Sequence, residues 1–135
     1  WSMKEAAYKI YTQHHEIRFF APKNFECKLM QDLKGVVCYK GQQFYTSSII
    51  NQQYIFTKAG LSKEESSYSE MASPDQIDTM IRRKLNVLTA LKMSGIKQKK
   101  SKNGVPSYHY KTTLLTSSCS ISHHGKYGTY SFLEA

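Results

Sequence analysis

The stretch SPDQIDTMIRRKLNVLTALKMSGIKQKKSKNGVPSYHYK, residues 73–111, decides how we interpret the whole chain. It begins with helix-start residues, because Ser73 can cap a helix and Pro74 fits the first helical position. Apolar residues then recur at helical spacing, and Gly95 can end a helix in the left-handed conformation. This pattern predicts one long amphipathic helix over residues 77–94.

A basic hairpin is expected directly after this helix. Residues 96–100 have the pattern of a short strand, Asn103-Gly104 is a strong hairpin signal, and residues 105–111 form the returning strand. Pro106 has no N–H to donate, so the returning strand should be an edge there. A long helix followed by a basic hairpin is how a winged-helix domain ends. We therefore predict an α+β fold of the winged helix-turn-helix type, with a three-helix core and a small antiparallel β-wing.

The rest of the chain is interpreted around that core. Apolar stripes predict helices over residues 25–34 and 49–60, which would complete the three-helix core. An N-terminal extension would hold a helix over residues 2–13 and a brief strand over residues 16–20, and residues 66–72 would be a polar linker. The predicted domains are an N-terminal extension (1–21), a winged-helix domain (22–115) and a weakly structured C-terminal tail (116–135).

The net charge of +9 is unevenly spread along the chain. Residues 1–81 hold nine Lys and Arg against nine Asp and Glu, whereas residues 82–135 hold ten against one. Such asymmetry indicates a polyanionic partner, with nucleic acid before an anionic membrane surface. The alternative is a basic surface that only keeps the chain soluble.

One side of the predicted helix has the composition of a DNA-reading surface. Arg pairs with guanine, Asn pairs with adenine, and a small residue such as Ala90 lets a helix approach the bases. An ordinary solvated helix face would have the same composition. The hairpin then adds lysines that suit phosphate groups, although lysines also protect exposed sheet edges and form nuclear localisation signals. The predicted nucleic-acid-binding residues are Thr79, Arg82, Arg83, Asn86, Lys97, Lys99, Lys100, Lys102, Asn103 and Lys111.

Aromatic residues on the returning strand are a further candidate feature. Tyr108, His109 and Tyr110 could stack on bases or sugars. We expect instead that one of the two tyrosines packs on the core while the other shows its hydroxyl to solvent.

The run RRKLNVLTALKMSGIKQKKSKN, residues 82–103, resembles the DNA-binding domain of the cell-cycle transcription factors that bind retinoblastoma pocket proteins, and of their DP-type partners. The resemblance implies a winged-helix architecture, in which Arg82 and Arg83 would contact bases or the DNA backbone. It covers about 22 residues, and Lys84-Leu85 stands where that family has Tyr-Asp.

Metal binding and catalysis find little support in the sequence. Cys119, His123 and His124 are close together, and the pair His14-His15 could join them, but there is no Cys-x-x-Cys. No phosphate-binding loop or common nucleophile motif is present, so we expect no metal, no cofactor and no enzymatic activity. A small basic ribonuclease using two His and a Lys stays open as an alternative.

The sequence therefore predicts binding of double-stranded DNA, sequence-specific or not, through the helix over residues 77–94 and the wing over residues 97–104. Since the chain begins at Trp1, we expect part of a larger transcription-related nuclear or chromatin protein, or a cytoplasmic or nucleoid one if prokaryotic or viral. The odd count of three cysteines favours a reduced compartment, so we expect no secretion. No apolar run is long enough to span a membrane.

The alternatives are a winged-helix module for protein–protein interaction and a small RNA-binding or RNA-cleaving protein. A protein partner would dock on residues 1–20 or on the C-terminal tail.

Overall fold

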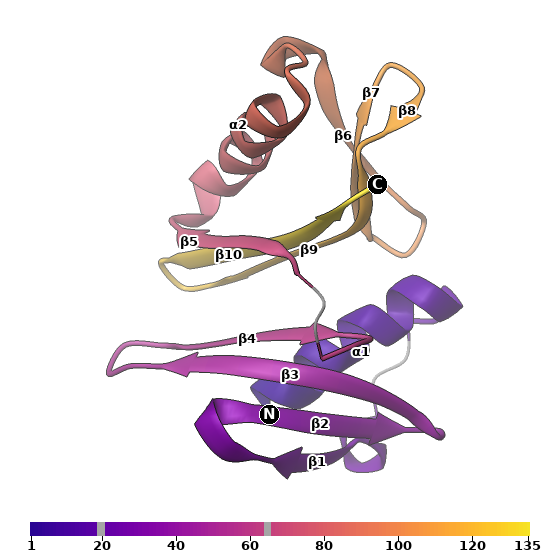
Figure 1. Cartoon of the computed structure of the whole chain (residues 1–135), viewed down its shortest axis with the longest axis vertical. Coiled ribbons are helices and arrows are strands. Elements are labelled where there is room, and N and C mark those ends of the chain that lie inside the picture. The colour runs from indigo at the N-terminus through magenta and orange to yellow at the C-terminus, as the bar shows by residue number, and fades with distance from the viewer. Residues whose placement is uncertain (19–20, 64–65) are drawn as a thin grey trace. The chain divides into compact units, whose positions relative to one another are not determined.

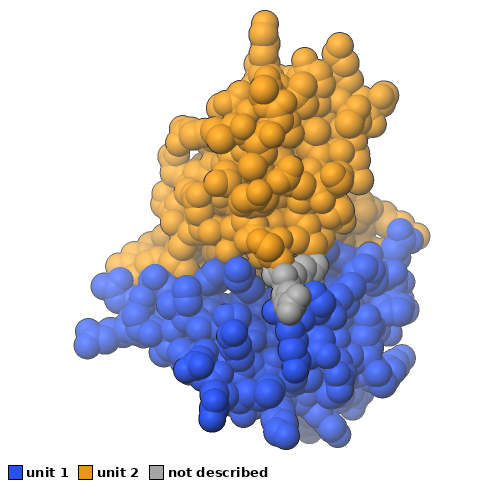
Figure 2. All heavy atoms as spheres, viewed as in Figure 1, with its two compact units in different colours: residues 1–65 blue, residues 66–135 orange. Residues whose placement is uncertain are grey.

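The computed structural model describes residues 1–18, 21–63 and 66–135, and the chain divides into two compact units. Unit 1 is Trp1–Glu65 and unit 2 is Ser66–Ala135 (Figures 1 and 2). The described residues hold two α-helices and three antiparallel sheets. A winged helix-turn-helix core needs three packed helices, so the predicted winged-helix fold is wrong. Neither described helix is long and apolar enough to cross a membrane.

Unit 1 packs one helix on one antiparallel sheet, whose strands follow in chain order β1-β2-β3-β4 (Figure 1). Its buried cluster joins Ala7 and Tyr11 of the helix to Phe25, Val37, Tyr39 and Phe44. The elements are α1 (Ser2–His15), the 3-10 turn η1 (Pro22–Asn24), β1 (Glu26–Leu29), the 3-10 turn η2 (Gln31–Leu33), β2 (Lys34–Tyr39), β3 (Gln42–Ile50) and β4 (Ile55–Gly60).

Helix α1 confirms the helix predicted over residues 2–13, but its role differs from the predicted one. Ala7 is fully buried and Tyr11 nearly so, because both pack into the cluster of unit 1. The segment is therefore part of the core of unit 1 and not an extension beside it. The strand predicted over residues 16–20 is absent from residues 16–18, and residues 19 and 20 lie outside the described part of the chain.

The helix predicted over residues 25–34 is wrong, because these residues form β1, η2 and the start of β2. Of the expected inward stripe only Phe25 is buried, whereas Leu29 and Met30 are exposed. Gly35, expected to end the helix, lies inside β2, where a Cβ would meet the Met3 side chain and approach the Lys28 carbonyl oxygen to 2.9 Å. The glycine thus allows close packing of α1 on the sheet.

The helix predicted over residues 49–60 is also wrong, since the chain forms the β3–β4 hairpin there. Asn51 makes the turn, because its Oδ1 accepts hydrogen bonds from the backbone N–H groups of Gln53 and Tyr54 at 2.8 and 3.0 Å. Ser48, expected to cap a helix, is hydrogen-bonded across the strands to Thr57, with 2.8 Å between the hydroxyl oxygens. The β-branched residues around this turn favour strands.

Unit 2 packs one helix against two three-stranded sheets, ordered β5-β10-β9 and β6-β7-β8 (Figure 1). Three helix residues, Ile77, Ile81 and Leu85, join buried strand residues that include Tyr108, Tyr130 and Phe132. The elements are β5 (Tyr68–Ala72), η3 (Pro74–Gln76), α2 (Ile77–Thr89), η4 (Met93–Gly95), β6 (Ile96–Lys100), β7 (Pro106–Tyr110), β8 (Thr113–Leu114), β9 (Thr116–His124) and β10 (Tyr127–Glu134).

The C-terminal residues correct two further predictions. The tail predicted to be weakly structured forms β9 and β10, which pair along their length and bury Cys119, Tyr130 and Phe132. The predicted linker over residues 66–72 includes β5, which pairs with β10. The boundary between the units therefore falls after Glu65, inside the domain predicted over residues 22–115.

Helix α2 confirms the predicted helix from residue 77 but ends five residues before the expected end. Ala90 takes the left-handed conformation with φ 60°, and its N–H donates to the Asn86 carbonyl. The Asn86 side chain also donates to the Leu91 carbonyl, at 2.7 Å, and holds the chain as it leaves the helix. Gly95 serves another purpose, because a Cβ there would run into the ring of Tyr110.

Candidate nucleic-acid interface

The basic hairpin has the form that the sequence predicts. Strands β6 and β7 pair from Ile96↔Tyr110 to Lys100↔Pro106. The Gly104 N–H donates to the Ser101 carbonyl at 2.9 Å, and Gly104 takes a left-handed φ of 79°. This is a hairpin loop that ends in a left-handed glycine. At Pro106 the strand pairs with β6 alone, since β8 meets β7 only at His109 and Tyr110, so the predicted edge is confirmed.

The lysines of this hairpin lie at the surface. In β6 only Ile96 is buried, and every following residue to Lys100 is exposed. Lys102 in the turn and Lys111 after β7 are exposed as well, and the Lys111 ammonium lies 5.7 Å from the centre of the Tyr110 ring. Flexible ammonium groups gathered on one hairpin are suited to contact with phosphate groups.

The two faces of the hairpin differ because side chains alternate along a strand. Ile96 and Tyr108 lie on the face that packs on the core, and both are fully buried, whereas Gln98 and Lys100 on the same face are exposed. The burial of Tyr108 confirms that one of the two tyrosines packs on the core. Tyr110 is half-buried and packs against the same cluster, so the outward orientation expected of the second tyrosine is not confirmed. The opposite face, here called the outer face, carries Lys97 and Lys99 of β6 beside Ser107 and His109 of β7.

Ser107 and His109 form a pair that the sequence analysis did not single out. The Ser107 hydroxyl and the His109 Nε2 are 3.0 Å apart, and the other ring nitrogen of His109 is buried with no hydrogen-bond partner. The signal in the sequence was the alternation in PSYHY, because a buried Tyr108 places both of its neighbours on the outer face.

The polar side of α2 is partly occupied by contacts within unit 2. The Arg82 Nε donates to the Asp78 carboxylate at 3.0 Å, and the Asn86 amide donates to the Leu91 carbonyl. Thr79 is half-buried, whereas Arg83 is exposed. Two of the four residues predicted to bind DNA from the helix therefore already have partners inside the protein.

Asp78 also ties the helix to the hairpin. The Tyr108 hydroxyl donates to Asp78 Oδ1 at 2.8 Å and accepts a hydrogen bond from the Gln98 side chain at 3.0 Å. Burial raises the pKa of Tyr108, and the hydrogen bond to Asp78 raises it further. The hydroxyl is thus a fixed, neutral link between α2 and β7, and it holds the hairpin to the core.

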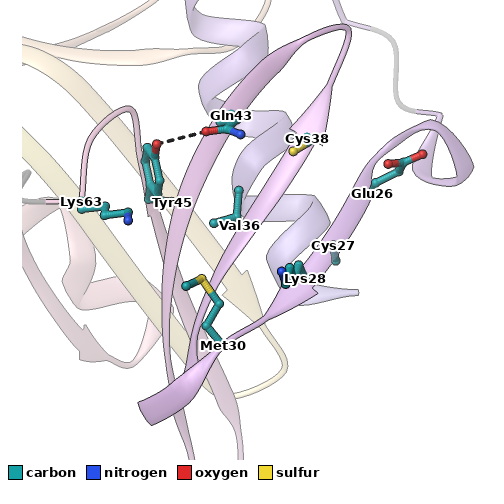
Figure 3. Close-up of a pocket in the computed structure, with 9 residues that line it drawn as sticks. All are labelled: Glu26, Cys27, Lys28, Met30, Val36, Cys38, Gln43, Tyr45 and Lys63. Carbon is teal, nitrogen blue, oxygen red and sulfur yellow. Dashed lines mark hydrogen bonds between the residues drawn. The ribbon is translucent and has the colours of Figure 1, made fainter.

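Unit 1 offers a second candidate in a shallow hollow of about 470 Å³ (Figure 3). Figure 3 shows its side chains on β1, β2 and β3, with Met30 just after β1 and Lys63 after β4, and the Tyr45 hydroxyl donates to Gln43 at 3.1 Å. The charged residues of this lining are all exposed, and Val36 and Cys38 are half-buried. An open surface of this kind does not hold a ligand by itself. The lining residues are Glu26, Cys27, Lys28, Met30, Val36, Cys38, Gln43, Tyr45 and Lys63.

The residues considered as metal ligands do not form a metal site in the described part of the chain. Within residues 1–18, 21–63 and 66–135 no group of three or more His, Cys, Asp or Glu could hold a metal ion. Cys119 is buried in the core of unit 2, and burial raises its pKa to about 12, so its thiol keeps its proton. His123 and His124 are exposed at the end of β9. The expected absence of a cofactor and of catalysis stays a prediction.

Comparison of the chain with protein-family models, with curated proteins and with solved structures finds no match. The resemblance of residues 82–103 to the cell-cycle transcription factors stays a prediction, although the winged-helix architecture that it implied is wrong.

Proposed function

We propose that this chain binds double-stranded DNA through the β6–β7 hairpin of unit 2. The observation that carries the proposal is the exposure of Lys97, Lys99, Lys100 and Lys102 on one hairpin, which its buried residues Ile96 and Tyr108 fix to the core. A rigid base lowers the entropy lost when the lysines meet a ligand.

Contact with the phosphate backbone, and not base reading, is the mechanism that this hairpin favours. Lysine presents a point charge without the planar fork with which arginine recognises guanine. Each neutralised phosphate releases counterions, so affinity falls steeply with salt. In this proposal α2 supports the hairpin through Asp78 and Tyr108, and it is not a recognition helix.

The test is fluorescence anisotropy with a random-sequence duplex across a salt series. Three to five phosphate contacts predict a slope of log affinity against log salt of about −2.7 to −4.5. A variant with Lys97, Lys99, Lys100 and Lys102 changed to Gln should lose most of that slope, and its affinity at ~50 mM salt should fall on the order of a hundredfold.

A control variant that loses the same number of charges elsewhere separates the effect of the hairpin lysines on binding from the effect of net charge. Lys23, Lys28, Lys34 and Lys40 of unit 1 are also exposed, so changing them to Gln removes the same four charges. We expect this control to bind DNA nearly as the unchanged chain does. Equal losses in the two variants would show that only the total charge matters, and the proposal would be wrong.

The hairpin lysines have one competing role that the same variants test. Strand β6 is the edge of the β6-β7-β8 sheet, and lysines on an edge prevent pairing with other chains. If that is their role, the hairpin variant will self-associate in size-exclusion chromatography while its DNA affinity stays the same. Preference for a matched single-stranded RNA would instead favour an RNA-binding protein.

A further inference from the structure

The outer face of the hairpin carries more than charge. Lys97 lies directly across from His109, and Lys99 lies across from Ser107. Residues directly opposite in an antiparallel pair have Cβ atoms about 5 Å apart. One small area of the sheet therefore carries the side chains of two lysines, a serine and a histidine.

The buried nitrogen of His109 indicates which way its hydrogen bond runs. Nδ1 is buried without a partner, and a buried N–H without an acceptor is rarer than an unpaired acceptor. A neutral ring therefore carries its proton on Nε2, which donates to the Ser107 oxygen 3.0 Å away. The Ser107 hydroxyl then accepts from His109 and can donate its own proton to a ligand.

We propose that this face is a phosphate-binding site, in which the Ser107 hydroxyl donates to a backbone phosphate of DNA between the ammonium groups of Lys97 and Lys99, and in which His109 is a positioning residue that orients the hydroxyl. This inference rests on the proposed function and deepens it, because it names the residues that hold one phosphate. A neutral donor between two lysines adds a hydrogen bond to a charged oxygen without releasing a counterion.

One salt series distinguishes the contribution of Ser107 to binding from that of Lys97. Ser107→Ala should weaken binding of the duplex about tenfold while the salt slope stays the same, since the hydroxyl carries no charge. Lys97→Gln should reduce the slope by about 0.9. Ser94→Ala, an exposed serine of η4, is the matched control and should bind as the unchanged chain does.

The positioning role of His109 is tested by rescue. In His109→Gln a side-chain amide can still donate to Ser107, so most of the affinity should remain. His109→Leu should fall to the level of Ser107→Ala, and the double variant Ser107→Ala with His109→Leu should fall no further. Additive losses would mean that His109 does not act through Ser107. Thermal unfolding of each variant shows whether the hairpin is intact.

Failure of this inference can be told apart from failure of the proposed function. If the unchanged chain shows no duplex binding at ~50 mM salt, the proposed function is wrong and this site falls with it. If the duplex binds with the expected slope but Ser107→Ala binds equally well, only the phosphate site is wrong. Binding of vesicles containing phosphatidic acid in place of duplex, lost in Ser107→Ala, would reassign the site to a lipid phosphate and overturn the proposal for DNA.

Discussion

Units 1 and 2 each pack one helix against antiparallel strands, but they distribute charge and buried groups differently. The cluster of unit 1 is mostly aromatic, and Phe25 stacks on Tyr39 with 4.2 Å between ring centres. Unit 1 holds nine Lys and Arg against six Asp and Glu, whereas unit 2 holds ten against four. Unit 2 also gathers four of its eight lysines on one hairpin, and its core holds the thiol and the tyrosine hydroxyls whose pKa burial raises. We therefore expect both ligand binding and a loss of stability at alkaline pH to belong to unit 2.

The largest expected effect tests whether the two clusters are independent. Leu85 is fully buried in unit 2, and Leu85→Ala should lower the free energy of unfolding of that unit by about 2–5 kcal/mol. Phe44→Ala should do the same in unit 1, by about 3–5 kcal/mol. Hydrogen exchange resolved along the chain should show lost protection only in the unit that carries the substitution. If each variant exposes amides of both units, the two unfold together and the comparison fails.

The same two units show which parts of the fold could be predicted from sequence. Helix α2 and the β6–β7 hairpin were found because their signals are local: a helical stripe and an Asn-Gly turn. Strand β9, with its run of serines, was missed because its stability comes from pairing with β10, which no local pattern encodes. In unit 1 the apolar residues of 25–34 happened to match helical spacing, while tertiary pairing made them strands.

Some features of the candidate site could likewise be predicted from local sequence patterns, and others could not. The exposure of the hairpin lysines followed from their strand pattern. The pairing of Asp78 with Arg82 could have been predicted from their spacing of four residues on a helix. By contrast, the hydrogen bond between Asp78 and Tyr108 joins residues 30 positions apart, and only the folded chain brings them together.

A smaller effect, a loss of stability at alkaline pH, should appear in unit 2, whereas burial lowers the pKa of Lys9 in unit 1 and so acts in the opposite direction. Burial raises the pKa of Cys119 from its usual value near 9 to about 12, and burial also raises the pKa of Tyr130 to about 12. The unfolded chain therefore loses these protons first, so stability is complete below pH 9 and falls as the pH rises towards 12. Each group contributes a loss of up to about 1.4 kcal/mol per pH unit.

Denaturant unfolding between pH 8 and pH 10.5 measures this decline. Cys119→Ala should make the decline shallower even if it lowers stability at neutral pH. Cys27→Ala is the control, because Cys27 is an exposed thiol of unit 1 and should leave the profile unchanged. A profile that Cys119→Ala does not alter would show that the buried thiol is not the cause.

The smallest expected effect concerns Arg82, which is charged and belongs to unit 2 but does not lie on the hairpin. Its ion pair with Asp78 is partly exposed, so Arg82→Ala should cost no more than about 0.5 kcal/mol of stability. The affinity for duplex should change less than twofold and the salt slope should stay the same, as in the unit 1 control Lys23→Ala. The same anisotropy series measures both quantities. A slope reduced by about 0.9 would mean that Arg82 leaves Asp78 to neutralise a phosphate, and the helix would then share the interface with the hairpin.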